Sequence, residues 1–120
     1  MSEGCYDFSP ALTALNEFTE KYPQSLLADN AGYLYWFNFY CGEGGYNDGQ
    51  MQELENQFRR ILTRYLDTDL RDELEFQIWA TVVERSNPDV AKIKRLGTEY
   101  LRRFPQSPRA TRVRQILAQF

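Results

Sequence analysis

The side chains of this chain that could perform acid–base or metal chemistry are almost all carboxylates. The 120 residues include no histidine, so the most common general base and a leading metal ligand are both missing. One group of oxygen-bearing side chains lies in the glycine-rich segment 42–49 and consists of Glu43, Asn47 and Asp48. Their spacing differs from the ligand pattern of a calcium-binding loop, so the segment is interpreted as a plain loop.

A second group of carboxylates stands where a helix is expected to begin. It comprises Asp67, Asp69, Asp72 and Glu73. Carboxylates are stabilised at helix N-termini by the helix dipole, so capping explains this group without catalysis. The sequence also has no nucleophile–base pair, phosphate-binding glycine loop or metal-ligand spacing. We therefore expect no enzymatic activity, no cofactor and no bound metal.

The two cysteines, Cys5 and Cys41, are the remaining reactive residues. Each lies 18 residues from Pro23, on opposite sides of it. If the chain folds back at Pro23 as an antiparallel hairpin, both thiols come to the open end of that hairpin. A disulfide there would stabilise the fold by about 3–4 kcal/mol and would indicate an oxidising compartment. Two unconnected thiols are the alternative.

The helices that must position these groups are indicated by a sequence repeat near the two ends of the chain. The first copy is Leu15, Phe18, Tyr22, Pro23, Gln24, Ser25 and Ala28, and the second is Leu96, Tyr100, Phe104, Pro105, Gln106, Ser107 and Ala110. Two aromatics four residues apart share one face of a helix, which the proline then ends. The serine is a candidate N-cap for the next helix. Each copy therefore predicts a helix, a sharp corner and another helix.

A third, degraded copy lies between these two. Its repeat positions are occupied by Ile61, Tyr65, Leu66, Thr68 and Arg71. The offset is 43 residues from the first copy to this one and 39 residues from this one to the last. Such periods are typical of helical-hairpin repeats.

The apolar periodicity and the turn signals predict an all-α fold of six helices. We expect them over residues 9–21, 25–41, 50–66, 70–85, 90–103 and 107–120. They should form three hairpins, at about 9–41, 50–85 and 89–120, within a single domain that spans 1–120.

A helix ending in aromatic-Pro-x-Ser, followed by Ala-x-x-Ala-Gly-x-x-Tyr, resembles the tetratricopeptide repeat. The nearest likeness is the divergent form in bacterial outer-membrane assembly lipoproteins and periplasmic Tol-Pal coordinators. Signature positions of the repeat's first helix are occupied by Ala28, Ala31, Gly32 and Tyr35. The resemblance implies a right-handed solenoid of helix pairs whose concave face binds a protein segment.

The same resemblance implies which residues face that groove. The concave positions correspond to Asp29, Tyr33, Trp36, Phe37, Asp72, Phe76, Trp79, Thr111 and Gln115. Large aromatics in such positions are typical of binding hot spots. The alternative is that the aromatics fill the core between hairpins. Residues 33–40 carry aromatics on every side of the predicted helix, and such a helix must be buried either by its own fold or by a partner.

Charge is divided unevenly between the two halves of the chain. Residues 1–58 carry one cation and nine carboxylates, a net charge of −8, whereas residues 59–120 carry 13 cations and eight carboxylates, a net charge of +5. The basic half could meet an acidic protein, an anionic membrane or nucleic acid, or could simply be a solvated helix face. The sequence pI near 5.0 and the absence of a reader motif argue against nucleic acid.

Three functions stay open. The first is a protein-binding adaptor in a cell-envelope assembly, the second is a small acidic inhibitor or immunity-type protein that uses Asp29, Glu43 and Asp48, and the third is a subunit that self-associates head to tail. No segment approaches the roughly 18 apolar residues of a membrane span. The start Met1-Ser2-Glu3-Gly4 does not have the pattern of a signal peptide, so we expect a cytoplasmic protein, or an envelope-associated one if a targeting segment has been removed.

Overall fold

The structure is a computed structural model that describes residues 9–25, 27–39 and 47–120. The described residues form six α-helices and no strand, which confirms the all-α prediction. The helices are α1 (Ser9–Lys21), α2 (Ala28–Phe39), α3 (Asp48–Arg64), α4 (Arg71–Val83), α5 (Val90–Arg103) and α6 (Ala110–Leu117).

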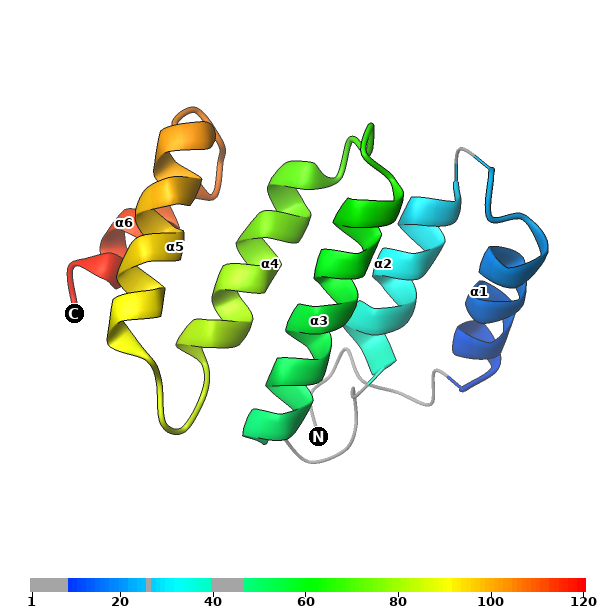
Figure 1. Ribbon diagram of the computed structural model, residues 1–120, viewed down its shortest axis with the longest axis horizontal. Helices are drawn as coiled ribbons and strands as arrows, with labels where there is room; N and C mark the ends of the chain where they lie inside the picture. Colours follow the sequence, from blue (N-terminus) through cyan, green and yellow to red (C-terminus); the bar gives the residue numbers. More distant parts are fainter. Residues whose placement is uncertain (1–8, 26, 40–46) are drawn as a thin grey trace.

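The helices follow one another in chain order along the longest axis of the molecule, and consecutive helices run antiparallel (Figure 1). The molecule measures 42 × 34 × 22 Å, so it is elongated and flat. The sharp corners of the three hairpins α1/α2, α3/α4 and α5/α6 all lie at the same end of the helices (Figure 1). Adjacent helices therefore pair as the helical hairpins that the repeat predicts.

The three corners share two hydrogen bonds of the same pattern, which supports the middle corner as a copy of the other two. In each corner, a hydroxyl oxygen accepts a hydrogen bond from the backbone N–H two residues later. The hydroxyls are those of Ser25, Thr68 and Ser107, at 3.2, 3.1 and 3.1 Å. The backbone N–H of the same three residues donates to the carbonyl of the preceding aromatic, at 3.0, 3.0 and 3.1 Å.

The prediction that these hydroxyls are helix N-caps is wrong. Because each hydroxyl closes a short turn instead, α2 and α6 begin three residues later than predicted, at Ala28 and Ala110. At α3 the helix begins earlier than predicted, at Asp48, since Asn47 and Gln50 form a capping box with bonds of 2.8 and 3.0 Å.

The core consists of two clusters on either side of α4. The first joins α2, α3 and α4 through Tyr33, Leu54, Phe58, Ile61, Leu74 and Ile78. The second joins α4, α5 and α6 through Phe76, Trp79, Val82, Ile93, Tyr100 and Val113. By contrast, no described residue of α1 is buried, so this helix covers only the outer flank of α2.

Candidate functional site

A groove of about 460 Å³ is the main candidate for a binding site among the described residues. Its walls come from α2, α4 and α6, and its floor comes from Met51, Leu54 and Phe58 of α3. The apolar walls are Phe37, Phe76, Trp79, Ala80, Val83 and Ile116. The polar groups that line it include Gln77, Glu84 and Arg112. An apolar hollow with a few polar groups is suited to binding a ligand or a peptide side chain.

Helical periodicity explains why these residues share one surface. On α4, the wall residues Phe76, Gln77, Ala80, Val83 and Glu84 recur every three or four positions, which keeps them on one face. On α6, Arg112 and Ile116 are separated by four residues and form the opposite wall. On α2, the ring of Phe37 is 45% exposed and forms the remaining wall.

A polar network borders the groove and crosses three elements. Its centre is the carboxylate of Glu73, which accepts hydrogen bonds from Tyr33 at 2.9 Å and from Gln77 at 3.1 Å. Arg109 donates to both oxygens of this carboxylate, at 2.7 and 2.8 Å, and lies 4.4 Å from the ring centroid of Phe76. Burial and the contact with Glu73 raise the pKa of Tyr33 above its ordinary value. The network therefore fixes α2 and the start of α6 to α4.

Three of the predicted site residues, Phe37, Phe76 and Trp79, line the groove. Of these, Phe37 is the most open, whereas Phe76 is only 8% exposed. Tyr33 is buried, and its ring packs 5.6 Å from that of Phe37.

Trp79, which was also predicted for the groove, lines it but offers it almost no exposed surface. This side chain is 1% exposed, and its indole Nε1 donates a 3.0 Å hydrogen bond to the carbonyl of Ile93 on α5. Trp36 is partly buried, packs against the first core cluster and is absent from the groove lining. Both tryptophans turn toward the following helix because that is where apolar area can be removed from water.

The two predicted aspartates join hairpins instead of lining the groove. Asp29 is 7% exposed and accepts a 2.6 Å hydrogen bond from Thr68, in the next corner. Asp72 accepts from the hydroxyl of Tyr100, which also bonds Ser107 at 2.8 Å. Burial and this aspartate raise the pKa of Tyr100 to about 12. Each aspartate thus fastens its helix to the corner of the next hairpin.

The remaining predictions for α6 are one position out of register. Thr111 and Gln115 are exposed and do not line the groove, whereas their neighbours Arg112 and Ile116 do. Sequence reasoning also missed further groove residues on α4, namely Gln77, Ala80, Val83 and Glu84. Ala80, Val83 and Glu84 follow Phe76 by four, seven and eight positions, and this helical spacing was the signal that could have found them.

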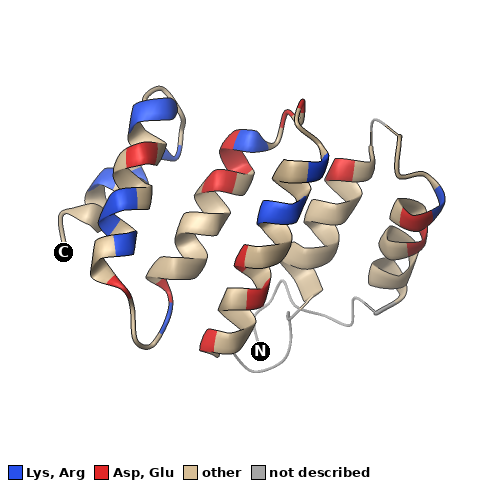
Figure 2. Cartoon of the chain, viewed as in Figure 1, with Lys and Arg blue, Asp and Glu red and all other residues tan. Residues whose placement is uncertain are grey.

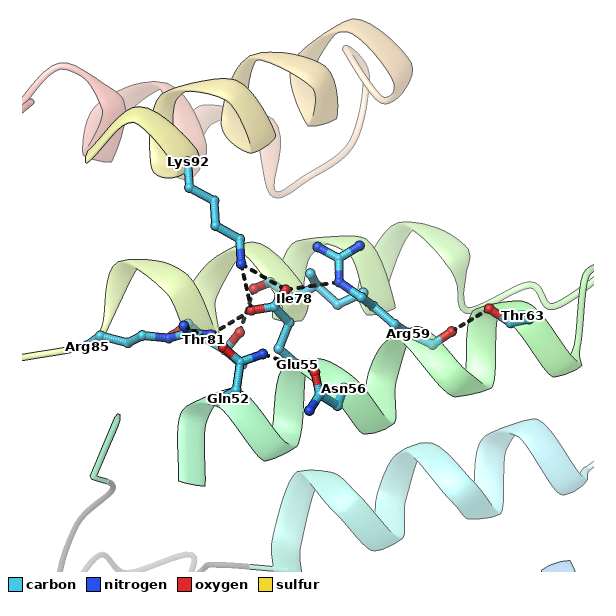
Figure 3. Close-up of polar contacts among 9 residues, drawn as sticks. All are labelled: Gln52, Glu55, Asn56, Arg59, Thr63, Ile78, Thr81, Arg85 and Lys92. Carbon is cyan, nitrogen blue, oxygen red and sulfur yellow. Dashed lines mark hydrogen bonds and ion pairs between the residues drawn. The ribbon is translucent and has the colours of Figure 1, made fainter. Parts of the chain in front are cut away.

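A buried carboxylate on α3 is the strongest electrostatic feature away from the groove. Glu55 is 3% exposed and pairs with Arg59 at 3.0 Å, Arg85 at 2.6 Å and Lys92 at 3.1 Å (Figure 3). Burial alone would raise the pKa of Glu55, but the hydrogen bonds from the three cations outweigh it and lower the pKa. Because Arg85 follows α4 and Lys92 lies on α5, the cluster ties three helices together.

Other predicted groups either fall outside the described residues or have structural partners. Cys5, Cys41 and Glu43 lie outside them, so the disulfide is not tested. Asp48 accepts hydrogen bonds from the backbone N–H of Ser86 at 2.8 Å and from its hydroxyl at 2.9 Å. These bonds lower the pKa of Asp48 and indicate that its role is structural.

Within the described residues, no group of three or more histidine, cysteine, aspartate or glutamate side chains is arranged to hold a metal ion. None of the described helices is long and apolar enough to span a membrane. Over the residues that the structure describes, the fold and site define the molecule as an all-α stack of helical hairpins with an apolar groove. Comparisons with protein-family models, curated proteins and solved structures give no match to this chain.

Proposed function

We propose that this chain is a tetratricopeptide-like interaction module that binds a segment of a partner protein in the groove of α2, α4 and α6. The proposal includes the absence of enzymatic activity and a role as an adaptor or scaffold, for which a bacterial cell-envelope assembly is the setting that the sequence resemblance suggests.

The observation that carries the proposal is the open apolar cavity of about 460 Å³ on this face. Its volume is large enough for more than one apolar side chain of a bound peptide. Phe37 lines it and is 45% exposed, and Leu34, one helical turn earlier on α2, is 46% exposed. A large apolar side chain left open in the wall of a hollow, as Phe37 is, is typical of a surface that is covered in a complex.

The alternative of an acidic inhibitor has less support. Of its three proposed carboxylates, Asp29 is buried against Thr68 and Asp48 is bonded to Ser86, so neither is free to meet a basic enzyme. Glu43 lies outside the described residues.

The experiment is a selection of peptides from a displayed random library against the full chain, followed by fluorescence anisotropy with the selected peptides. The variant Phe37→Ala should weaken binding by about tenfold or more, since hot-spot aromatics contribute at least this much. Ala80→Trp should block the groove and abolish binding. The matched control is Leu66→Ala, which truncates a side chain that is 72% exposed in the α3–α4 corner. Equal affinities for the wild type and both groove variants, or no selected peptide at all, would contradict the proposal.

A further inference from the structure

The lining of the groove between α2, α4 and α6 includes two charged side chains. They are Arg112 on α6 and Glu84, the residue that follows α4, and both are exposed. Among the described residues, neither of them takes part in an ion pair. The third wall contributes no charge, because the only charged residue of α2 is Asp29, which is buried (Figure 2). Arg112 and Glu84 therefore set the charges that a segment bound in this groove would meet.

These two charges lie toward opposite ends of the groove. The helices α4 and α6 both run away from the end at which the corners lie, and Arg109, just before α6, contacts Glu73 in the first turn of α4 (Figure 1). In the repeat register, in which α6 starts 39 residues after α4, Arg112 corresponds to Glu73. Glu84 is 11 residues further along than Glu73, which is a rise of about 16 Å in a helix. The groove thus has a positive end near the corners and a negative end at the other side.

Helix stability does not explain why these two charges stand where they do. Cations are disfavoured near a helix N-terminus and anions near a C-terminus, because the helix dipole has the same sign there. Arg112 is the third residue of α6, and Glu84 is the C-cap residue of α4, so both add to the dipole instead of offsetting it. By contrast, α3 has Asp48 in its first turn and Arg64 in its last turn, as the dipole favours. The positions of Arg112 and Glu84 are those expected of charges that meet a ligand.

The charges next to these two already have partners within the chain. Near the positive end, Arg109 donates to both carboxylate oxygens of Glu73, at 2.7 and 2.8 Å. Beyond Glu84, the side chain of Arg85 pairs with Glu55 at 2.6 Å. Because each of these ion pairs is close to neutral, it leaves the field of the unpaired charge beside it largely intact.

We infer that the segment bound in this groove is apolar in its middle and carries opposite charges at its two ends. A carboxylate of the segment faces Arg112, a cation faces Glu84, and the apolar side chains between them fill the hollow beside Phe37, Val83 and Ile116. A span of about 16 Å corresponds to about eleven residues of a helix or about five residues of an extended chain. This inference rests on the proposed function and adds to it the chemistry of the partner.

The test begins with four displayed libraries of peptides of about 15 residues, which span the groove even as a helix, selected against the full chain. All four have a randomised, mainly apolar centre. Two carry acidic residues at one end and basic residues at the other, in either order, because the segment can run in either direction. The other two carry the same charge at both ends. We expect the tightest binders to come from the libraries with opposite charges.

Double-mutant cycles on a selected peptide, measured by fluorescence anisotropy, then assign each charge to its partner. Replacing the acidic residues of the peptide by glutamine should weaken binding to the wild type by about fivefold, but binding to Arg112→Gln by less than about twofold. The basic residues should show the same dependence on Glu84→Gln. The matched controls are Arg114→Gln and Glu17→Gln, which remove exposed charges outside the groove lining and should leave both fivefold losses unchanged. Circular dichroism checks that each variant is folded.

The outcomes separate this inference from the proposed function on which it rests. Peptides that Phe37→Ala weakens, but whose charges show no coupling to Arg112 or Glu84, would overturn the inference and leave the groove as a binding site. Tightest binders with the same charge at both ends would also overturn it. If none of the four libraries gives a binding peptide, both the inference and the proposed function are contradicted.

Discussion

Two helical glycines allow a test of the packing that is independent of any partner. Gly97 is buried on α5 where this helix approaches both α4 and α6. A Cβ atom added at this position would lie 2.9 Å from Nε1 of Trp79 and 2.9 Å from Cδ2 of Leu117. Gly32 on α2 is the contrasting case, because its nearest neighbour would be Cδ1 of Ile61 at 3.6 Å, an ordinary contact distance.

The two alanine substitutions should therefore change stability in opposite directions. In an exposed or roomy helix, Gly→Ala stabilises by roughly 0.8–1.0 kcal/mol through backbone entropy. Overpacking a filled core costs about 1–3 kcal/mol. Leu117 can move its flexible end, but the indole of Trp79 is 1% exposed and held by its bond to Ile93. Gly97→Ala should thus lower the free energy of unfolding by about 0–2 kcal/mol, whereas Gly32→Ala should raise it by about 0.5–1 kcal/mol.

Urea titration followed by circular dichroism at 222 nm measures both values on the same scale. We expect Gly32→Ala to be more stable than Gly97→Ala by about 0.5–3 kcal/mol. A Gly97→Ala variant as stable as Gly32→Ala would refute the reasoning, since the close approach of α5 to Trp79 could then not be real.

Three further predictions follow from individual contacts. Trp79→Ala should destabilise the fold by about 3–5 kcal/mol because its side chain is fully buried. Trp36→Ala should destabilise it by less than about 2 kcal/mol because the Trp36 side chain is only partly buried. Thermal melting monitored by circular dichroism should show a clearly lower melting temperature for Trp79→Ala than for Trp36→Ala. The lowered pKa of Glu55 means that its ion pairs contribute fully above the ordinary glutamate pKa of 4.5 and lose their contribution as pH falls through the depressed value. The gap in unfolding free energy between wild type and Glu55→Gln should therefore be constant at neutral pH and shrink in acid, and a gap that widens in acid would contradict the assignment. Asn47→Ala should cost about 1 kcal/mol in urea titration through loss of the capping box, whereas a neutral result would exclude the cap.

The helices and their corners could be predicted from sequence because both depend on local patterns. Aromatic spacing, proline and the Ser or Thr hydroxyl act within a few residues, and the structure repeats the same turn at all three corners. The starts of α2 and α6 could not be predicted, since a hydroxyl that caps a helix and one that closes a turn have the same sequence. On α4 the predicted Phe76 and Trp79 line the groove, whereas on α6 the prediction was one position out of register because helix rotation is set by the neighbouring helices.

Contacts between distant residues were beyond the sequence argument for the same reason. Glu55 meets partners 30 and 37 residues away, at Arg85 and Lys92, and only its bond to Arg59 follows a local spacing. Asp29 was predicted to face a ligand from the repeat resemblance, and its bond to Thr68, 39 residues away, leaves no local pattern that would have corrected this.

The different positions of the two tryptophans show how one residue on a neighbouring helix decides between core and surface. Trp36 and Trp79 occupy equivalent repeat positions, yet only Trp79 is fully buried. At the α2–α3 junction, the position equivalent to Gly97 is occupied by Phe58, whose ring belongs to the cluster that Trp36 packs against. At the α4–α5 junction, Gly97 has no side chain, and the indole of Trp79 occupies the space next to it. A groove residue in such a repeat can therefore be assigned only after the residue that opposes it on the next helix is known. By this argument Phe37, which lines the groove and stays 45% exposed, is the aromatic of α2 best placed to meet a partner.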